Sequence, residues 1–565
     1  MIARPAPTAI ERDKADIGVD FDFEALARRP LPEIPQNVVA LFKWTGIYQQ
    51  LQKGFFMVRV RLPGGRITAD RLDGLAAIAD EFGQGELCLT TRQTFQLHWV
   101  RWADLHRVLA RLAAIGLDSK NACGDVTRNV VTCPFQGVCP HEVGDVRDTI
   151  LALADDPEIR DRQRNLPRKH KISVAGCDRA CNQTLMNCHS WVPVLRDGPG
   201  GPVRGFRWYA GGGLGARPIL AKAIFDWVPE ALVIAVARAG VEVYRREGDR
   251  RVRALARLKF VVERMGPRGF GDAVLAELRA RGVAGHDAIE PAADPVPRVG
   301  PAAFEGETAV PQRQAGFRTV RARIPRGEIA AARARRLAEL ARRHGDGSLQ
   351  CTARQNLQWR FVPEAQVPAL LDALRGEGLA LDGLDHPPDV VACVGTTVCN
   401  LAVSDTPNAY RALEAAMSAD PDLWRAVGPL RIHLNGCPNA CAQHWIADIG
   451  LRGTRREAAE GSEEGFTVHV GGGLAGPGHV ARPVCDVPAD RVVEVVQRIL
   501  RAYLDGRDGA DESFGDWARR TGPAGVAALV GLPPAPPEAL NVEMLRLRPL
   551  LDRIVEEARH DDDAR

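Results

Sequence analysis

The sequence predicts an internally duplicated α+β fold in which a small βαβα unit and a larger domain occur together twice. Residues 55–116 and 317–380 pass through strand-like and helix-like patterns in the same order. Within them, the segments LTTRQTFQLHW and CTARQNLQWRF look like one sequence written twice. Two sets of four cysteines share one spacing, and a segment rich in Pro and Ala separates the halves. This period is far longer than a solenoid repeat of roughly 20–50 residues, which favours duplication of a whole domain pair.

Each small unit is expected to run strand, helix, strand, helix. In the first, FFMVRVRLPGGRIT precedes the amphipathic stretch DRLDGLAAIADEFG, and ELCLTTRQTFQLHWV precedes WADLHRVLARLAAIGL. In the second, FRTVRARIPRGEI, a helical stretch ending in ARRHGDG, SLQCTARQNLQWRFV and VPALLDALRGEGL repeat the plan. A larger domain that carries four of the cysteines follows each unit.

At 565 residues the chain is longer than one hydrophobic core usually organises, which predicts several domains. We expect their boundaries to follow the repeat and the linker. The expected divisions are an N-terminal arm (1–39), a first small unit (40–117), a first larger domain (118–290), a linker (291–316), a second small unit (317–382), a second larger domain (383–505) and a C-terminal tail (506–565).

Composition excludes several classes of partner. The formal charge is +3, from 74 basic and 71 acidic side chains, so no field over the whole protein attracts nucleic acid or a membrane surface. No apolar run approaches the ~20 residues of a membrane helix, and the N-terminus lacks the pattern of a targeting signal. We therefore expect a cytoplasmic protein, whose thirteen cysteines serve metal ligation or catalysis rather than disulfides.

The clustered cysteines indicate a metal centre. Each set has the spacing Cys-x5-Cys, a gap of 37 residues and Cys-x3-Cys, and the second set lies 260 residues after the first. Four thiolates presented as two close pairs can enclose an iron–sulfur cluster. Zinc sites favour Cys-x2-Cys pairs, so a cluster is the favoured interpretation, with zinc and unligated thiols as alternatives. The sets are Cys133, Cys139, Cys177, Cys181 and Cys393, Cys399, Cys437, Cys441.

The motifs CVGTTVCNLA (393–402) and NGCPNACAQHWIADIG (435–450) resemble the cluster-binding segments of the sirohaem-dependent sulfite and nitrite reductases. The resemblance extends over nearly all of residues 40–505 and includes RQTFQLH, LPRKHK and GGGLG. It implies two ferredoxin-like half-domains and two larger sirohaem/4Fe-4S domains. It also implies that Cys393, Cys399, Cys437 and Cys441 hold a 4Fe-4S cluster and that Cys441 also binds the sirohaem iron.

An anionic cofactor and an anionic substrate require a cationic pocket. Sirohaem carries eight carboxylates, and Arg61 and Arg168 are among the basic residues of the family-like segments. By the resemblance, four residues line the substrate side, where arginine suits oxyanion binding and lysine suits proton donation. These four are Arg59, Arg128, Lys169 and Lys171. The expected contacts to sirohaem or its surroundings are Arg92, Gln96, His98 and Asn439.

Two features depart from well-known members of the family or vary among them. The first cysteine set is complete here, whereas well-known members keep only the second, so we hypothesise a second cluster at Cys133, Cys139, Cys177 and Cys181. A second sirohaem is not expected, since Pro388 and Pro429 stand where counterparts of Arg128 and Lys169 would lie. Some members also join a tyrosine and a cysteine by a thioether beside the haem, and Tyr48 and Cys123 occupy these positions.

The resemblance implies six-electron reduction of sulfite, with nitrite as the alternative substrate. Two lysines at 169 and 171 favour sulfite, because plant-type nitrite reductases tend to carry Asn at the second position. GGGLG and GGGLAG do not match the dinucleotide fingerprint, so a separate ferredoxin or flavoprotein should supply electrons. The remoter alternatives are an oxygenase similar to precorrin-3B synthase, which acts on a tetrapyrrole, and an iron–sulfur carrier or assembly subunit without catalysis.

Overall fold

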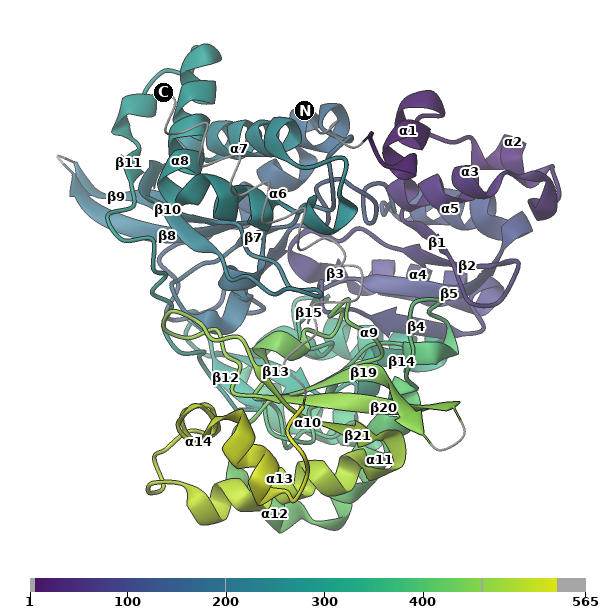
Figure 1. Cartoon of the computed structure of the whole chain (residues 1–565), viewed down its shortest axis with the longest axis vertical. Helices are drawn as coiled ribbons and strands as arrows, with labels where there is room; N and C mark the ends of the chain where they lie inside the picture. The colour runs from purple at the N-terminus through teal and green to yellow at the C-terminus, as the bar shows by residue number, and fades with distance from the viewer. Residues whose placement is uncertain (1–5, 199, 459–460, 536–565) are drawn as a thin grey trace.

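The computed structural model describes residues 6–198, 200–458 and 461–535. In Figure 1 the first larger domain lies at the upper left with the first small unit to its right, and the second larger domain lies at the bottom. None of the described helices is long and apolar enough to cross a membrane. All thirteen cysteines are free thiols.

The N-terminal arm packs on the first small unit rather than standing apart from it. It forms α1 (Ala9–Asp16), α2 (Phe23–Ala27) and α3 (Gln36–Leu41). Phe23, Ile34 and Val39 are buried in the core that the two small units share. The elements of the first unit are β1 (Ile47–Gln49), β2 (Phe55–Arg59), β3 (Arg66–Thr68), α4 (Ala69–Phe82), β4 (Glu86–Leu89), β5 (Phe95–Arg101) and α5 (Leu105–Ala114).

The two small units exchange one strand each. The second unit consists of β12 (Ala309–Pro311), β13 (Phe317–Ala322), β14 (Glu328–Ala330), α9 (Ala331–His344), β15 (Ser348–Cys351), β16 (Leu357–Pro363) and α10 (Val367–Gly376). The sheet orders are β1-β2-β5-β4-β14 and β12-β13-β16-β15-β3, so β14 extends the first sheet and β3 extends the second. One hydrophobic core therefore spans both units.

The sequence predicted two continuous strands in each small unit. This prediction was wrong, because each of the two segments forms a pair of shorter strands. A three-residue turn at 63–65 separates β2 from β3, and Gly64 and Gly65 there have φ of 69° and 73°. A Cβ on Gly65 would lie 2.7 Å from Gln93 Cβ, so glycine is required by space as well as by φ. ELCLTTRQTFQLHWV is likewise a hairpin of β4 and β5, with Gln93 at φ 56° in its turn.

The larger domains repeat one architecture. The first has the sheet order β11-β10-β9-β8-β7-β6 and the second β17-β18-β19-β20-β21. The first contains β6 (Val131–Thr132), α6 (Arg147–Asp155), β7 (Ile172–Val174), β8 (His189–Gly198), β9 (Gly201–Ala210), β10 (Lys222–Pro229), α7 (Val233–Glu247), α8 (Leu258–Ala280) and β11 (Glu290–Pro291). The second contains β17 (Val391–Ala392), α11 (Thr406–Ala419), α12 (Pro421–Val427), β18 (Ile432–Asn435), β19 (Ile449–Ala458), β20 (Gly461–Val470), β21 (Arg482–Pro488), α13 (Val492–Gly506) and α14 (Phe514–Leu529).

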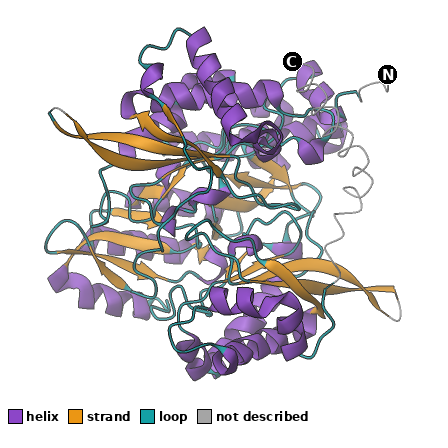
Figure 2. Ribbon diagram, turned by 60° about the vertical axis from the view of Figure 1, so that its left-hand side comes forward, coloured by secondary structure: helices purple, strands orange, loops and turns teal. Residues whose placement is uncertain are grey.

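An approximate two-fold relation connects the halves. The long hairpins β8/β9 and β19/β20 project to opposite sides of the molecule (Figure 2). Gln183 and Gln443, 260 residues apart, donate to each other's side-chain oxygen at 2.6 and 3.0 Å. The loops that carry the last cysteine of each set therefore meet where the halves face one another.

The C-terminal tail predicted from residue 506 begins later. Phe514 and Trp517 of α14 are buried in the core of the second larger domain. The helix breaks at Gly522, before Pro523, as α8 breaks at Gly266 in the first half. The helix α14 is thus the counterpart of α8. The sequence did not indicate it because its buried apolar residues are spread among charged ones. Residues 536–565 lie outside the described residues.

Candidate functional site

A cavity of about 290 Å³ lies between the first half and the cysteine loops of the second. Among its described lining residues there is no aspartate or glutamate. One of its cations, Arg168, pairs with the carboxylate of Asp125 at 3.2 Å, and Asp125 is not part of the lining. A pocket that concentrates positive charge in this way is suited to an anionic ligand, because unpaired buried charge is costly. Its cationic lining residues are Arg59, Arg92, Arg128, Arg168, Lys169 and Lys171.

The antiparallel pair β2 and β5 presents one wall of this cavity. Arg59 lies opposite Gln96 in the register, and Gln96 accepts from Arg59 Nε (3.1 Å) and Nη2 (2.6 Å) when its amide oxygen faces the guanidinium. His98 also lines the cavity, and both of its ring nitrogens lack a partner within the protein. Burial and the neighbouring charge of Arg59 together lower the pKa of His98 to about 4, so the ring is neutral at pH 7.

Arg92 occupies the turn of the β4/β5 hairpin. Its Nη1 donates to Asn187 Oδ1 (2.6 Å) and its Nη2 to the carbonyl of Asn129 (2.7 Å), while Nε has no partner. Burial lowers the pKa of Arg92 to about 9. The hydrogen bonds fix the guanidinium at the cavity wall, and the remaining N–H is available to a ligand.

Lys169 and Lys171 lie on one face of the segment that leads into β7. His170 between them is fully buried, and its ring contacts that of His189 at a centroid distance of 4.4 Å. The predicted alternation is present, because both lysines line the cavity. The backbone N–H of Arg128 donates to the carbonyl of His170 (3.0 Å), which places Arg128 beside the lysine pair.

All four cysteines of the second set line the same cavity. The backbone N–H groups of Gly395, Leu401 and Asn439 each donate to the thiol two residues earlier, in Cys393, Cys399 and Cys437. Cys441 is exposed to the cavity. Thr91 Oγ1 of the first small unit donates to the carbonyl of Cys441 (2.7 Å), which ties the cationic wall to the cysteine loop.

Other predicted residues have different positions. Asn439 lines the cavity, and its Nδ2 lies 3.6 Å from Cys437 Sγ. Arg61 points elsewhere, since it pairs with Asp155 at 2.7 Å. Tyr48 lines the cavity, and its side chain hydrogen-bonds Arg128. Cys123, a buried free thiol, also lies near Arg128.

The sequence argument missed several polar residues of the cavity wall, two of which connect the halves or the small units. Thr91 and Gln355 both line it. Gln355 belongs to the second small unit, yet it donates to the carbonyl of Leu89 (3.1 Å) and accepts from the N–H of Ala392 (3.0 Å). The repeated Arg-Gln pair in the two similar segments was the available signal.

The first cysteine set is outside this cavity. Cys133, Cys139 and Cys177 are buried in the first larger domain, and Cys181 lines a separate cavity of about 90 Å³. In neither set, and nowhere else in residues 6–535 as described, do three or more His, Cys, Asp or Glu side chains converge on a point for a single ion. Ligands at the corners of a cluster lie farther apart than the ligands of one ion, so four thiols around a larger group fit this arrangement.

The donor set of the main cavity fits sirohaem and a 4Fe-4S cluster. Six cationic side chains without carboxylates suit a polycarboxylate macrocycle, and unpartnered N–H groups at Arg92 and His98 remain for its oxygens. The four thiols supply a cluster's ligands, with Cys441 exposed on the side of the cations.

Comparison with known proteins agrees with this chemistry. The family described as "Nitrite and sulphite reductase 4Fe-4S domain" matches residues 123–281 and 384–534. The family described as "Nitrite/Sulfite reductase ferredoxin-like half domain" matches residues 48–115 and 310–376. The duplication into ferredoxin-like half-domains and larger domains is thereby confirmed.

Individual relatives cover nearly the whole chain. An assimilatory ferredoxin-dependent nitrite reductase of Haloferax mediterranei is 31% identical over 92% of this chain and 92% of its own length. A sulfite reductase (ferredoxin) 1 of Mycolicibacterium paratuberculosis is 30% identical over 85% of this chain and 88% of its own. The structure of the Mycobacterium tuberculosis NirA protein superimposes with a TM-score of 0.79, at 27% identity, over 92% of this chain and 95% of that one.

These findings give no support to the precorrin-3B synthase alternative, because the similar proteins are named as reductases. The match spans both halves, and it includes the cysteine loops and the cationic wall. The chain therefore belongs to the family of nitrite and sulfite reductases, oxidoreductases that use sirohaem and a 4Fe-4S cluster.

Proposed function

We propose that this enzyme reduces sulfite to sulfide in a six-electron reaction. The observation that carries the proposal is the position of Lys169 and Lys171, which both line a carboxylate-free cavity with Arg59 and Arg128, facing the loop of Cys441. When bound, sirohaem and the cluster would supply the electrons for the reduction, one at a time. The chain's own residues must bind the oxyanion, orient it within the cavity and provide protons.

Oxyanion binding is the role of Arg59 and Arg128 in this proposal. A guanidinium offers a fixed fork of N–H donors and keeps its charge at all physiological pH values. Arg128 is held through Nε and Nη2, which donate to the carbonyl of Gly124 at 3.1 and 2.8 Å. Because these bonds fix its orientation, little side-chain entropy is lost when an anion binds.

Proton donation is the role of Lys169 and Lys171. Each oxygen of sulfite leaves as water only after it receives protons. Burial lowers the pKa of both lysines well below that of free lysine, and neighbouring arginines lower it further. A lowered pKa makes the ammonium group a readier acid, while the anionic cofactor and substrate oppose the shift.

Nitrite is the second candidate, because the Haloferax relative is named as a nitrite reductase. Nitrite also loses its oxygens as water and needs the same cations. Lysine rather than asparagine at 171 supports sulfite as the preferred anion. The names of these relatives also support a ferredoxin as the electron donor, and we place the reaction in the cytoplasm, where thiols stay reduced.

Steady-state rates with each anion test the proposal. With reduced ferredoxin or reduced methyl viologen as donor, kcat/KM should be higher for sulfite than for nitrite, and six electrons should be consumed per sulfide released. A higher kcat/KM for nitrite, with ammonia as the product, would establish the second candidate instead. No turnover of either anion by protein that contains sirohaem would contradict both.

A further inference from the structure

The first cysteine set lies in loops that match those of the second set element by element. Cys133 and Cys139 follow β6, as Cys393 and Cys399 follow β17. Cys177 and Cys181 follow β7, as Cys437 and Cys441 follow β18. In each domain the two strands are parallel neighbours, so the two loops leave the same edge of the sheet.

The same hydrogen bonds to sulfur occur in both sets. The backbone N–H groups of Phe135, His141 and Arg179 donate to the thiols of Cys133, Cys139 and Cys177, each two residues earlier. For Phe135 the distance from N to Cys133 Sγ is 3.4 Å. These donors correspond, at a shift of 260 residues, to Gly395, Leu401 and Asn439 of the second set. Hydrogen bonds to thiolate sulfur are a means by which proteins stabilise iron–sulfur clusters.

The four thiols of the first set are close neighbours. Cys133 and Cys181 hydrogen-bond each other, and Cys177 lies near enough to interact electrostatically with Cys139 and Cys181. No disulfide joins them. Conventional packing would need neither four thiols in one place nor a repeated set of backbone donors aimed at them.

The fourth cysteine is where the two sets differ. The N–H of Ala303 donates to Cys181 Sγ at 3.2 Å, whereas Cys441 is exposed to the main cavity. The segment around Ala303 belongs to the connection between the halves. Its Phe304 packs edge-on against Phe135 with ring centroids 5.2 Å apart. The connection therefore covers the side of Cys181 that corresponds to the exposed side of Cys441.

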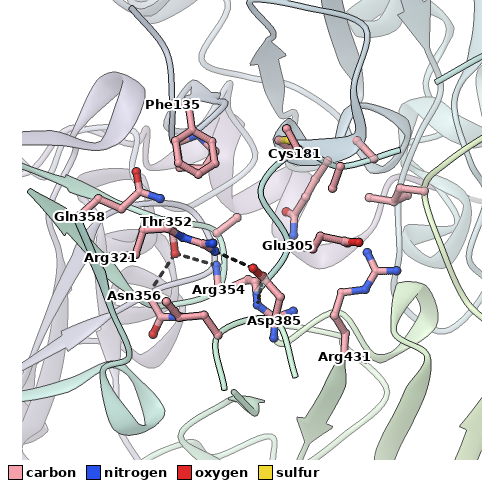
Figure 3. A pocket seen from close by; sticks show the side chains of 18 of the residues that line it. Phe135, Cys181, Glu305, Arg321, Thr352, Arg354, Asn356, Gln358, Asp385 and Arg431 are labelled. Atoms are coloured by element: carbon pink, nitrogen blue, oxygen red, sulfur yellow. Dashed lines mark hydrogen bonds and ion pairs between the residues drawn. The ribbon is translucent and has the colours of Figure 1, made fainter. Parts of the chain in front are cut away.

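The cavity next to Cys181 has lost the properties that suit sirohaem (Figure 3). Arg321 and Arg354 are counterparts of Arg59 and Arg92, but both pair with Asp385, at 2.6 and 3.3 Å. Arg431, the counterpart of Lys171, pairs with Asp448 at 3.0 Å. Carboxylates neutralise the charges of these three arginines. The cavity next to Cys181 also has a volume of about 90 Å³, against about 290 Å³ for the main cavity, so it does not suit a polycarboxylate macrocycle.

We propose that Cys133, Cys139, Cys177 and Cys181 hold a second 4Fe-4S cluster, which is covered by the connection between the halves and has no haem beside it. This cluster would be separate from the sirohaem and the 4Fe-4S cluster of the main cavity. The proposal does not depend on whether sulfite or nitrite is reduced. We infer a 4Fe-4S cluster because the first set shares its cysteine spacing and its backbone hydrogen bonds to sulfur with the second set. A single zinc ion fits less well, because the thiols do not converge on one point.

Iron and acid-labile sulfide in the full-length holoenzyme, purified anaerobically, test the proposal. One sirohaem and two clusters predict about nine irons and about eight sulfides per chain, against about five and about four with a single cluster. About five irons with sirohaem present would overturn the proposal, whether the first set then holds about one zinc or none. Failure of the proposed function is a different result, since it would appear as absent sirohaem or absent turnover.

Variants locate the extra iron. Cys139→Ala combined with Cys177→Ala should remove about four irons and about four sulfides while the sirohaem absorbance remains. Cys351→Ala changes a fully buried thiol of the shared core that belongs to neither set, and it should lose no iron. If the double variant kept all nine irons, or lost sirohaem in proportion to iron, the assignment would be wrong. Should the double variant not fold, the count on the unmodified protein decides.

Discussion

Lys169 and Lys171 illustrate how a nearly neutral protein prepares a strongly cationic site. The chain has a formal charge of +3, yet six cations line one cavity without a carboxylate. Burial lowers the pKa of both lysines because it disfavours the charged form, and an anion in the cavity would oppose this shift. The cost of this arrangement is offset when cofactor and substrate bind.

Lys171→Asn should reduce sulfite turnover more than nitrite turnover. Loss of a general acid typically costs about 100-fold or more in kcat, and asparagine retains a donor but cannot give up a proton. Lys120→Asn provides a control, because Lys120 is a surface residue paired with Asp161 at 2.7 Å. The measurement is kcat for both anions in each variant. Equal losses for sulfite and nitrite would remove the argument for sulfite.

A thioether between Tyr48 and Cys123 is a second residue-level prediction. Both residues neighbour Arg128, and Cys123 is fully buried. The tryptic peptides of the holoenzyme should appear as one joined species with the summed mass less two hydrogens, which pass with two electrons to an oxidant such as dioxygen. Recovery of both peptides unmodified and in full yield would dismiss the crosslink.

Sequence resemblance predicted all the cationic residues and the four second-set thiols of the cavity wall, because they lie in recognisable motifs. Arg59, Arg92 and Lys171 illustrate this, whereas Arg61 was an unproductive candidate two residues from Arg59. Gln355 escaped because its role depends on the strand exchange between halves, which places a second-unit side chain at the first unit's site. No local pattern encodes that contact.

At the scale of elements, hairpin turns rather than strands position the site. The segment 86–101 reads as one strand because its apolar and β-branched residues continue through the turn. The chain nevertheless reverses where Gln93 takes a positive φ, and Gln93 Nε2 donates to the carbonyl of Thr132 (2.9 Å) in the larger domain. A long-range contact thus decided against local propensity, and Arg92 lies at the site because of it.

The connection between the halves depends on Asp385. This carboxylate pairs with Arg321 and Arg354 and accepts from the N–H of Gly306 (3.3 Å). Asp385→Asn should destabilise the fold by about 3–5 kcal/mol, because it leaves the buried guanidinium of Arg321 without a carboxylate partner, whereas Arg354 keeps Asp389 at 2.9 Å. Asp382→Asn, at an exposed position 3.9 Å from Arg323, should have little effect. Thermal unfolding midpoints compare the two variants, and equal midpoints would contradict the assignment.

The effect of Asp385 should depend on pH in a defined direction. Burial alone would raise its pKa, but Arg321 and Arg354 hold it at about 2, below the value of about 4 for a free carboxyl. A lowered pKa contributes stability that is complete above about pH 4 and is lost as pH falls toward 2. The difference in midpoint between the wild type and Asp385→Asn should therefore be the same at pH 7 and pH 5. A difference that shrinks over this interval would show that Asp385 is already protonated there.

At the scale of the molecule, one catalytic site requires both halves of the duplication. The first half supplies the cations and the second supplies the thiols, and β3 and β14 are exchanged between the small units. Residues 1–290 and 291–565 produced separately should each fail to bind sirohaem, since each lacks part of the site and one strand of its sheet. Co-production of the two pieces is the matched control, and sirohaem bound by either piece alone would contradict the shared site.

Sirohaem content measured together with the visible spectrum tests the central claim most directly, namely that a cationic wall of one half faces a cluster thiol of the other. The account predicts about one sirohaem per chain, with absorption bands that shift when sulfite or nitrite is added to the reduced protein, and loss of sirohaem in Cys441→Ala. Colourless protein after production with adequate iron and tetrapyrrole supply would contradict it, as would sirohaem retained at full occupancy in Cys441→Ala.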